Sequence, residues 1–248
     1  MKIIKYKKTN KGRYKVTLDD GRELLLYEEV ILKFELLLKK EISESELDQV
    51  NLCNQEWDVY YVALQNIRAR FKSVYDLREV LMKKEYPLES INLAIDKLQK
   101  QGYLNDRSYA KSYINQQIIT TSKGPNKIKL ELLKHKVDDS IVLEELQVFD
   151  ENLQLEKIRK IIGKLIKTNH TRGGLVLKRK IITDLDHMGY ESSFVYKVLE
   201  EFDFSDCGDI AKKEYQKLYQ RLSRKYEGKE LEYKIREKLY QKGLYYEN

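Results

Sequence analysis

Residues 128–146 read IKLELLKHKVDDSIVLEEL, and this stretch decides the fold because its pattern returns along the chain. Apolar Ile128 and Leu132 lie one helical turn apart and are followed by Lys136-Val137. The polar residues 138–140 then precede a second apolar segment, which begins at Ile141. Apolar residues at this spacing are typical of an amphipathic helix, and polar residues between two such segments favour helix ends. The stretch therefore predicts two short consecutive helices.

The same pattern begins at Leu77, Ile128, Ile181 and Ile235, at intervals of 51, 53 and 54 residues. A further helical segment precedes each start, so the unit is three helices, repeated three times and begun a fourth. We expect a mainly α fold in which tandem three-helix repeats form an elongated array. The alternative is one compact helical domain with chance similarity, which would have a radius of gyration of about 18 Å.

The first 30 residues differ from the rest, because strand-like segments flank the turn sequence Asp19-Asp20-Gly21-Arg22. An isolated hairpin is marginally stable, so we expect it to pack on the helix that follows, near residues 30–40. The predicted divisions are 1–56 for the hairpin and helix, 57–104, 105–152 and 153–207 for three repeats, and 208–248 for a partial fourth.

Helix ends are also marked in the sequence. Ser43 with Glu46, and Ser73 with Asp76, have the spacing of side-chain caps at helix N-termini. Gly102 follows an amphipathic segment, where a glycine commonly ends a helix.

Composition excludes several classes of protein. The 248 residues include only 2 prolines but 19 tyrosines, which disfavours a disordered chain. No apolar stretch approaches the roughly 18 residues of a membrane span, and no secretory signal follows Met1. Cys53 and Cys207 lack metal-binding spacing, so we expect a reducing, cytoplasmic environment and no disulfide. No catalytic, cofactor or metal motif is present, and we expect a protein that is not an enzyme.

Charge is segregated in step with the repeat. Residues 157–180 carry nine basic and no acidic side chains, whereas residues 138–156 carry seven acidic and no basic ones. Charge runs are commonly solvated faces, but alternation in phase with a repeat also suits a long polyanion such as nucleic acid. Binding through such residues would be tolerant of sequence and sensitive to salt. The predicted interface residues are Arg78, Lys83, Lys84, Lys127, Lys129, Lys134, Lys164, Arg172, Lys178, Arg179 and Lys180.

The stretches LQKQGYLNDRSYAKSY at 98–113 and KGPNKIKLEL at 123–132 resemble the signature region of RecX-type regulatory proteins. The resemblance covers residues 57–248 and weakens toward the C-terminus. One departure is Lys136-Val137, where the family often has Gly-Ile. The resemblance implies a protein that binds the RecA–DNA filament along its groove and inhibits strand exchange and coupled ATP hydrolysis. Some members of that family also bind DNA directly.

The leading hypothesis is therefore a monomeric regulator of the RecA filament, and it implies no cofactor and no membrane. A second hypothesis is a sequence-tolerant DNA-binding repeat protein that acts without RecA. A helical scaffold for another acidic protein is a third.

Overall fold

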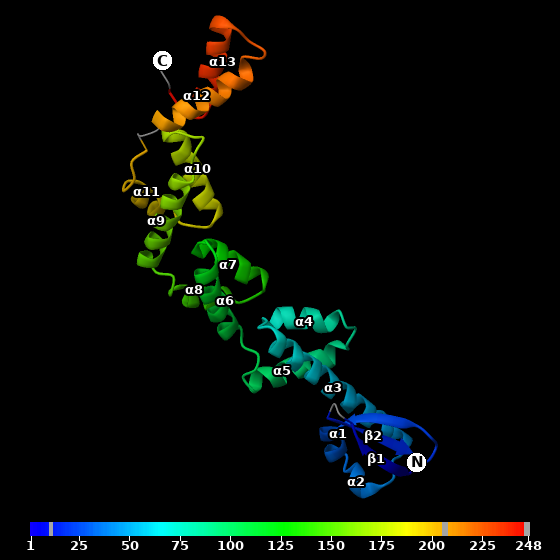
Figure 1. Cartoon of the computed structure of the whole chain (residues 1–248). Helices are drawn as coiled ribbons and strands as arrows, with labels where there is room; N and C mark the ends of the chain where they lie inside the picture. The colour runs from blue at the N-terminus through cyan, green and yellow to red at the C-terminus, as the bar shows by residue number, and fades with distance from the viewer. Residues whose placement is uncertain (10–11, 205–207, 246–248) are drawn as a thin grey trace. The chain divides into compact units, whose positions relative to one another are not determined.

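The computed structural model describes residues 1–9, 12–204 and 208–245. The chain is mainly helical there, with one three-stranded antiparallel sheet at the N-terminus, which confirms the expected fold class (Figure 1). Two compact bodies are present, and each is described separately. Body 1 comprises 1–109 and 135–138, and body 2 comprises 110–134 and 139–248. Cys207 and residues 246–248, which carried sequence-based expectations, lie outside the described residues.

The sheet of body 1 consists of β1 (Ile3–Lys8), β2 (Arg13–Leu18) and β3 (Glu23–Tyr27), in the order β1-β2-β3. The predicted hairpin turn is confirmed: Gly21 has φ of 87°, and its N–H donates to the carbonyl oxygen of Leu18 at 3.1 Å. Glycine adopts this positive φ without the steric cost that a Cβ would add. The sheet contributes the buried side chains of Val16, Leu18 and Leu26 to the core.

Two short helices and one long helix cover the buried face of the sheet. They are α1 (Glu28–Lys33), α2 (Leu36–Lys39) and α3 (Glu44–Ala69). Glu35, with φ of 53°, separates α1 from α2, so the single helix expected near residues 30–40 is two short ones. The Ser43 hydroxyl accepts the N–H of Glu46 at 3.2 Å, as its spacing predicts. Leu47 and Val50 of α3 complete the core of the sheet.

Helix α3 also belongs to a second core in body 1, formed with α4 (Val74–Met82) and α5 (Leu88–Lys100). Val59, Ala63 and Leu64 are buried there. The expected division between residues 56 and 57 therefore falls inside one continuous helix. One amphipathic helix can serve two cores because its length places successive turns against different partners.

Asp58 links these two cores. Its Oδ1 accepts hydrogen bonds from Arg13 at 2.7 Å and from the Tyr27 hydroxyl at 2.8 Å, and its Oδ2 accepts the Tyr86 hydroxyl at 2.7 Å. The Arg13 guanidinium also lies 4.4 Å from the centroid of the Tyr27 ring. Burial, followed by the bond to Asp58, raises the pKa of Tyr86 to about 12, so its proton stays in this network. The sheet is thus tied to the turn between α4 and α5.

The remaining helices continue the triplet pattern. We call α3–α5, α6–α8 and α9–α11 the first, second and third repeats, and α12–α13 the partial repeat. Their bounds are Asp106–Thr120 for α6, Pro125–Lys134 for α7, Asp139–Leu146 for α8, Glu151–Lys167 for α9, Gly174–His187 for α10, Ser192–Leu199 for α11, Gly208–Leu222 for α12 and Gly228–Gln241 for α13.

The second helix of each repeat is followed, within three residues of its end, by a residue with positive φ. These residues are Glu85, Lys136, Gly189 and Gly243, with φ of 62°, 57°, 87° and 69°. At Gly189 the next N–H, of Tyr190, donates back to the carbonyl oxygen of Leu185 at 3.1 Å. This is the hydrogen bond that closes a Schellman motif. Gly102 ends α5 in the same way, as predicted, with φ of 76°.

Three of these helix ends contact the preceding repeat, either in the first turn of its second helix or in the loop just before that helix. In body 1, His135 Nδ1 lies 2.9 Å from a carboxylate oxygen of Asp76. In body 2, the N–H of Gly124 donates to the carbonyl oxygen of Met188 at 2.7 Å. The N–H of Gly173 donates to the carbonyl oxygen of Lys242 at 2.9 Å. The same pair of segments is therefore in contact three times, within the two bodies.

Candidate polyanion-binding surface

Seven of the eleven predicted interface residues have exposed side chains, and none of the seven forms an ion pair with another described residue. We call these seven the free cations. They are Lys83, Lys84, Lys127, Lys134, Lys164, Arg172 and Arg179. A cation without a carboxylate partner keeps its charge available to a phosphate, so these residues are the best candidates for contacts with a polyanion.

Helix α7 separates free from paired cations. Lys127 and Lys134 are seven residues apart, so they lie on one side of the helix, two turns from each other. Lys129 is on the other side and bonds Asp139 at 2.8 Å. Ile128 and Leu132 between them are fully buried. Lys127 and Lys134 therefore belong to the candidate surface, and Lys129 ties α7 to the start of α8.

The consecutive residues 178–180 of α10 are brought to three sides of the helix, because each residue turns the helix by about 100°. Arg179 is exposed, opposite the buried Leu177 and Ile181. Lys180 is paired with Asp184 on the same helix, and Lys178 Nζ lies 6.0 Å from the centroid of the Phe204 ring. The three do not form one patch, and Arg179 is the member that is free.

The first repeat shows the same distinction. Arg78 of α4 donates to the side-chain oxygen of Asn92 on α5. Lys83 and Lys84 follow the end of α4 and are exposed. In the third repeat, Lys164 of α9 and Arg172 of the following loop are also exposed.

Several charged side chains of the alternating basic and acidic segments have their partners within body 2. Arg159 of α9 forms two hydrogen bonds, each of 2.6 Å, with the carboxylate of Glu201 after α11. Glu151 of α9 bonds Lys197 of α11 at 2.9 Å. Lys157, counted in the basic run 157–180, bonds the carbonyl oxygens of Ile118 and Thr121. Burial lowers the pKa of Lys157. The alternation of charge therefore serves packing as well as any external partner.

An exposed stripe on α13 was missed by the sequence reasoning. Lys229, Tyr233, Arg236 and Tyr240 are spaced by four, three and four residues, and all are exposed. They lie opposite the buried core residues of that helix, and Tyr240 meets Tyr245 edge to face at 6.0 Å. Alternating cations and aromatic rings are suited to the backbone and bases of a single strand. The spacing of these four residues can be recognised in the sequence, but which side of α13 is exposed is known only from the structure.

Among the described residues, no three His, Cys, Asp or Glu side chains gather in a way that could hold a metal ion. None of the helices described is long and apolar enough to span a membrane.

Comparisons with known proteins agree on one family. A family model described as RecX, second three-helix domain, matches residues 105–146. A regulatory protein RecX of Streptococcus sanguinis is 30% identical, over 98% of this chain and 95% of that protein. One from Listeria monocytogenes is 29% identical, over 100% of this chain and 94% of that protein.

Solved structures give the same result. A crystal structure of a regulatory protein RecX aligns with a TM-score of 0.72 and 25% identity, over 80% of this chain and 98% of that one. A RecX structure from Lactobacillus salivarius aligns with a TM-score of 0.57 and 26% identity, over 60% of this chain and 97% of that one.

Proposed function

The chain belongs to the RecX family of regulatory proteins, and we propose that it binds the RecA–DNA filament and inhibits strand exchange and the coupled hydrolysis of ATP. The proposal assigns the protein no catalytic step of its own. It acts as a monomer in the cytoplasm, without a cofactor, on a partner that is itself a helical array of identical protomers.

The single observation that carries this proposal is the distribution of the free cations. They occur in each of the first three repeats rather than in one cluster: two after α4, two on α7, and one each on α9, on α10 and in the loop that joins them. A repeating partner presents the same acidic groups at intervals, so cations on successive repeats can each meet one set. Linked modules then gain affinity because the first contact raises the effective concentration of the next.

The second candidate function is binding to DNA without RecA. The α13 stripe favours it, because Tyr233 and Tyr240 are exposed beside cations and would stack on unpaired bases. Each function predicts a different dependence on RecA, so one set of measurements distinguishes them.

The test is the DNA-dependent ATPase of RecA, measured with this protein at stoichiometric ratios, together with binding to DNA with and without RecA. We expect the ATPase to fall and the protein to bind the filament more tightly than naked DNA. An unchanged ATPase and unchanged filament stability would refute the proposal. Equal affinity for naked DNA and filament would favour the second function.

A substitution with a matched control sharpens the test. Reversing Lys127 and Lys134 together removes two free cations from one side of α7. Reversing Lys7 and Lys8, which are exposed on the N-terminal strand, changes the net charge by the same amount. The first variant should lose inhibition and the second should keep it, provided that both have the melting curve of the parent.

A further inference from the structure

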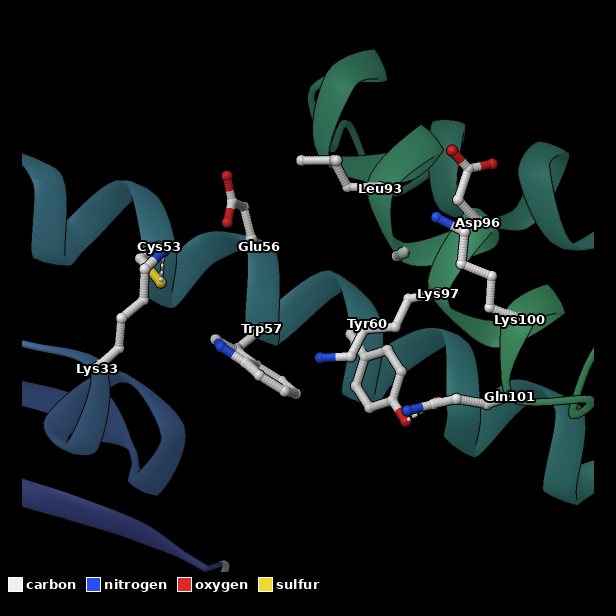
Figure 2. A pocket seen from close by; sticks show the side chains of 11 residues that line it. Lys33, Cys53, Glu56, Trp57, Tyr60, Leu93, Asp96, Lys97, Lys100 and Gln101 are labelled. Atoms are coloured by element: carbon white, nitrogen blue, oxygen red, sulfur yellow. Dashed lines mark hydrogen bonds between the residues drawn. The ribbon is translucent and has the colours of Figure 1, made fainter.

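A hollow of about 600 Å³ lies in body 1, between α3, α5 and the end of α1, and none of the free cations lines it (Figure 2). A volume of this size is within the range of pockets that hold small molecules. Its walls combine aromatic rings, ammonium groups and one amide. The residues that line it are Lys33, Cys53, Glu56, Trp57, Tyr60, Leu93, Ala94, Asp96, Lys97, Lys100 and Gln101.

The aromatic wall is formed by Trp57 and Tyr60 of α3, whose rings meet edge to face at 5.3 Å. The ammonium group of Lys97, from α5, lies over the indole of Trp57 at 3.2 Å from the ring centroid and 4.7 Å from that of Tyr60. An ammonium so close to a ring face is held by a cation–π interaction. Lys97 thus covers an aromatic face that would otherwise be open to the hollow.

Three ammonium groups line this hollow, and none is ion-paired with another described residue. Besides Lys97, they belong to Lys33, whose Nζ lies 3.5 Å from the Cys53 sulfur, and to Lys100, which is exposed. The two carboxylates of the lining, Glu56 and Asp96, point away from the Trp57 ring (Figure 2). The charged group at the ring faces is therefore the ammonium of Lys97, on which the carboxylate of Glu29 also acts from outside the lining.

The side-chain amide of Gln101 is held in a fixed orientation at the wall of the hollow. The side-chain oxygen of Gln101 accepts the Tyr60 hydroxyl at 2.8 Å. Since an amide oxygen that accepts this bond fixes the plane of the amide, the NH2 group of Gln101 is left as a positioned donor.

We propose that this hollow binds one nucleotide of a single-stranded nucleic acid. The base lies on the indole of Trp57, in the place that Lys97 occupies, and the phosphates meet Lys33, Lys100 and the displaced Lys97. Gln101 donates to a carbonyl or ring nitrogen of the base. A base inside a duplex cannot present its face, so the site selects unpaired nucleotides. This inference goes beyond the proposed binding to the RecA–DNA filament, and it assigns single-strand binding to residues that belong neither to the free cations nor to the α13 stripe.

A protein side chain is the less suitable occupant. An arginine or lysine from a partner would also fit the face of an indole, but it would enter among three ammonium groups. A nucleotide combines the flat ring and the negative charge that these walls accept.

The experiment uses Trp57 as its own probe, because it is the one tryptophan in the sequence. The full-length protein is titrated at low salt with oligothymidylate, with a duplex of equal length and with inorganic tripolyphosphate. Anisotropy of a labelled oligonucleotide reports total binding in parallel. We expect saturable quenching of Trp57 fluorescence by oligothymidylate, in step with anisotropy, and little quenching by the duplex or by tripolyphosphate.

Three outcomes would overturn the inference: oligonucleotide binding without quenching, equal quenching by tripolyphosphate, or quenching by an oligoarginine peptide in place of oligothymidylate. A pair of variants keeps the test independent of folding. Lys100→Glu should weaken the quenching titration about five- to tenfold, because an exposed phosphate contact becomes a repulsion. Lys5→Glu, an exposed lysine of β1, should leave it unchanged. Equal effects of the two would also overturn the inference.

Discussion

The backbones of Gly124 and Gly189 lie so close together that a Cβ on Gly124 would collide with Gly189, and a Cβ on Gly189 would collide with Lys127. A Cβ on Gly124 would lie 2.6 Å from the carbonyl carbon of Gly189, and a Cβ on Gly189 would lie 2.7 Å from the Cβ of Lys127. The N–H of Asn126 donates to the carbonyl oxygen of Gly189 at 3.1 Å across this contact. The second and third repeats are therefore joined in body 2 by backbone contact, which tolerates no added carbon.

Gly189→Ala tests this contact. Alanine at φ of 87° is strained, and its Cβ would also collide with Lys127. The left-handed conformation costs roughly 1–2 kcal/mol, and overpacking adds about 1–3 kcal/mol. Gly102→Ala is the matched control, since Gly102 ends a helix at φ of 76° with nothing within 4 Å of its Cβ. Urea unfolding should show a larger loss of stability for Gly189→Ala; equal losses would mean that the contact is not tight.

Many of the helices were predictable because they are amphipathic or begin at a capping residue, as at Ser73, whose hydroxyl accepts the N–H of Asp76 at 3.0 Å. The repeat was predictable for the same reason. The Gly124–Gly189 contact was not, because it joins residues 65 positions apart and depends on tertiary packing.

The candidate surface was predictable only as a list of basic residues. Which of them are free depends on partners such as Asp139, which bonds Lys129, and Glu201, which bonds Arg159. The pair Lys180–Asp184 has the spacing of a helical ion pair and could have been recognised from the sequence. The Trp57 hollow could not, since α3 and α5 supply its walls from distant positions.

Asp58→Asn tests the link between the sheet and the first repeat. The amide keeps the shape but loses the charge that bonds Arg13 at 2.7 Å, and one of its atoms becomes a donor facing a donor. A hydrogen bond to a charged group contributes roughly 1.5–3 kcal/mol, and we expect a loss of that size in chemical denaturation. Tyr86→Phe removes one bond of the same carboxylate and should cost about 1 kcal/mol. A smaller loss for Asp58→Asn than for Tyr86→Phe would contradict this assignment.

The salt dependence of DNA binding tests the division between free and paired cations on α7. Each phosphate contact that is lost should reduce the slope of log K against log salt by about 1. The double variant Lys127→Gln, Lys134→Gln should therefore lower that slope by up to about 2. Lys129→Gln should lower it less, because Lys129 is bonded to Asp139. Anisotropy titrations at several salt concentrations give the slopes. Equal effects per lysine would show that the ion pair with Asp139 does not keep Lys129 from contacting phosphate.

The pH dependence of stability tests the contacts of Glu131, whose Oε2 accepts Lys123 Nζ at 2.7 Å and the Tyr113 hydroxyl at 2.8 Å. Burial acts to raise the pKa of Glu131, but these two bonds outweigh it and hold the pKa below its usual value. The folded state thus binds the proton less tightly than the unfolded chain does. The stabilisation is complete above the unfolded pKa of about 4.3 and is lost as pH falls through the folded pKa.

Glu131→Gln should therefore reduce the free energy of unfolding at pH 7, by roughly 1–2 kcal/mol, and the difference from the parent should shrink below about pH 4. Glu156→Gln is the control, because Glu156 pairs with Lys160 on a solvent-exposed helix face. Solvent screens this ion pair, so its removal should change the free energy of unfolding little. Urea titrations at pH 7 and at acid pH give both differences. A difference for Glu131→Gln that stays constant with pH would mean that its carboxylate does not stabilise the loop before α7.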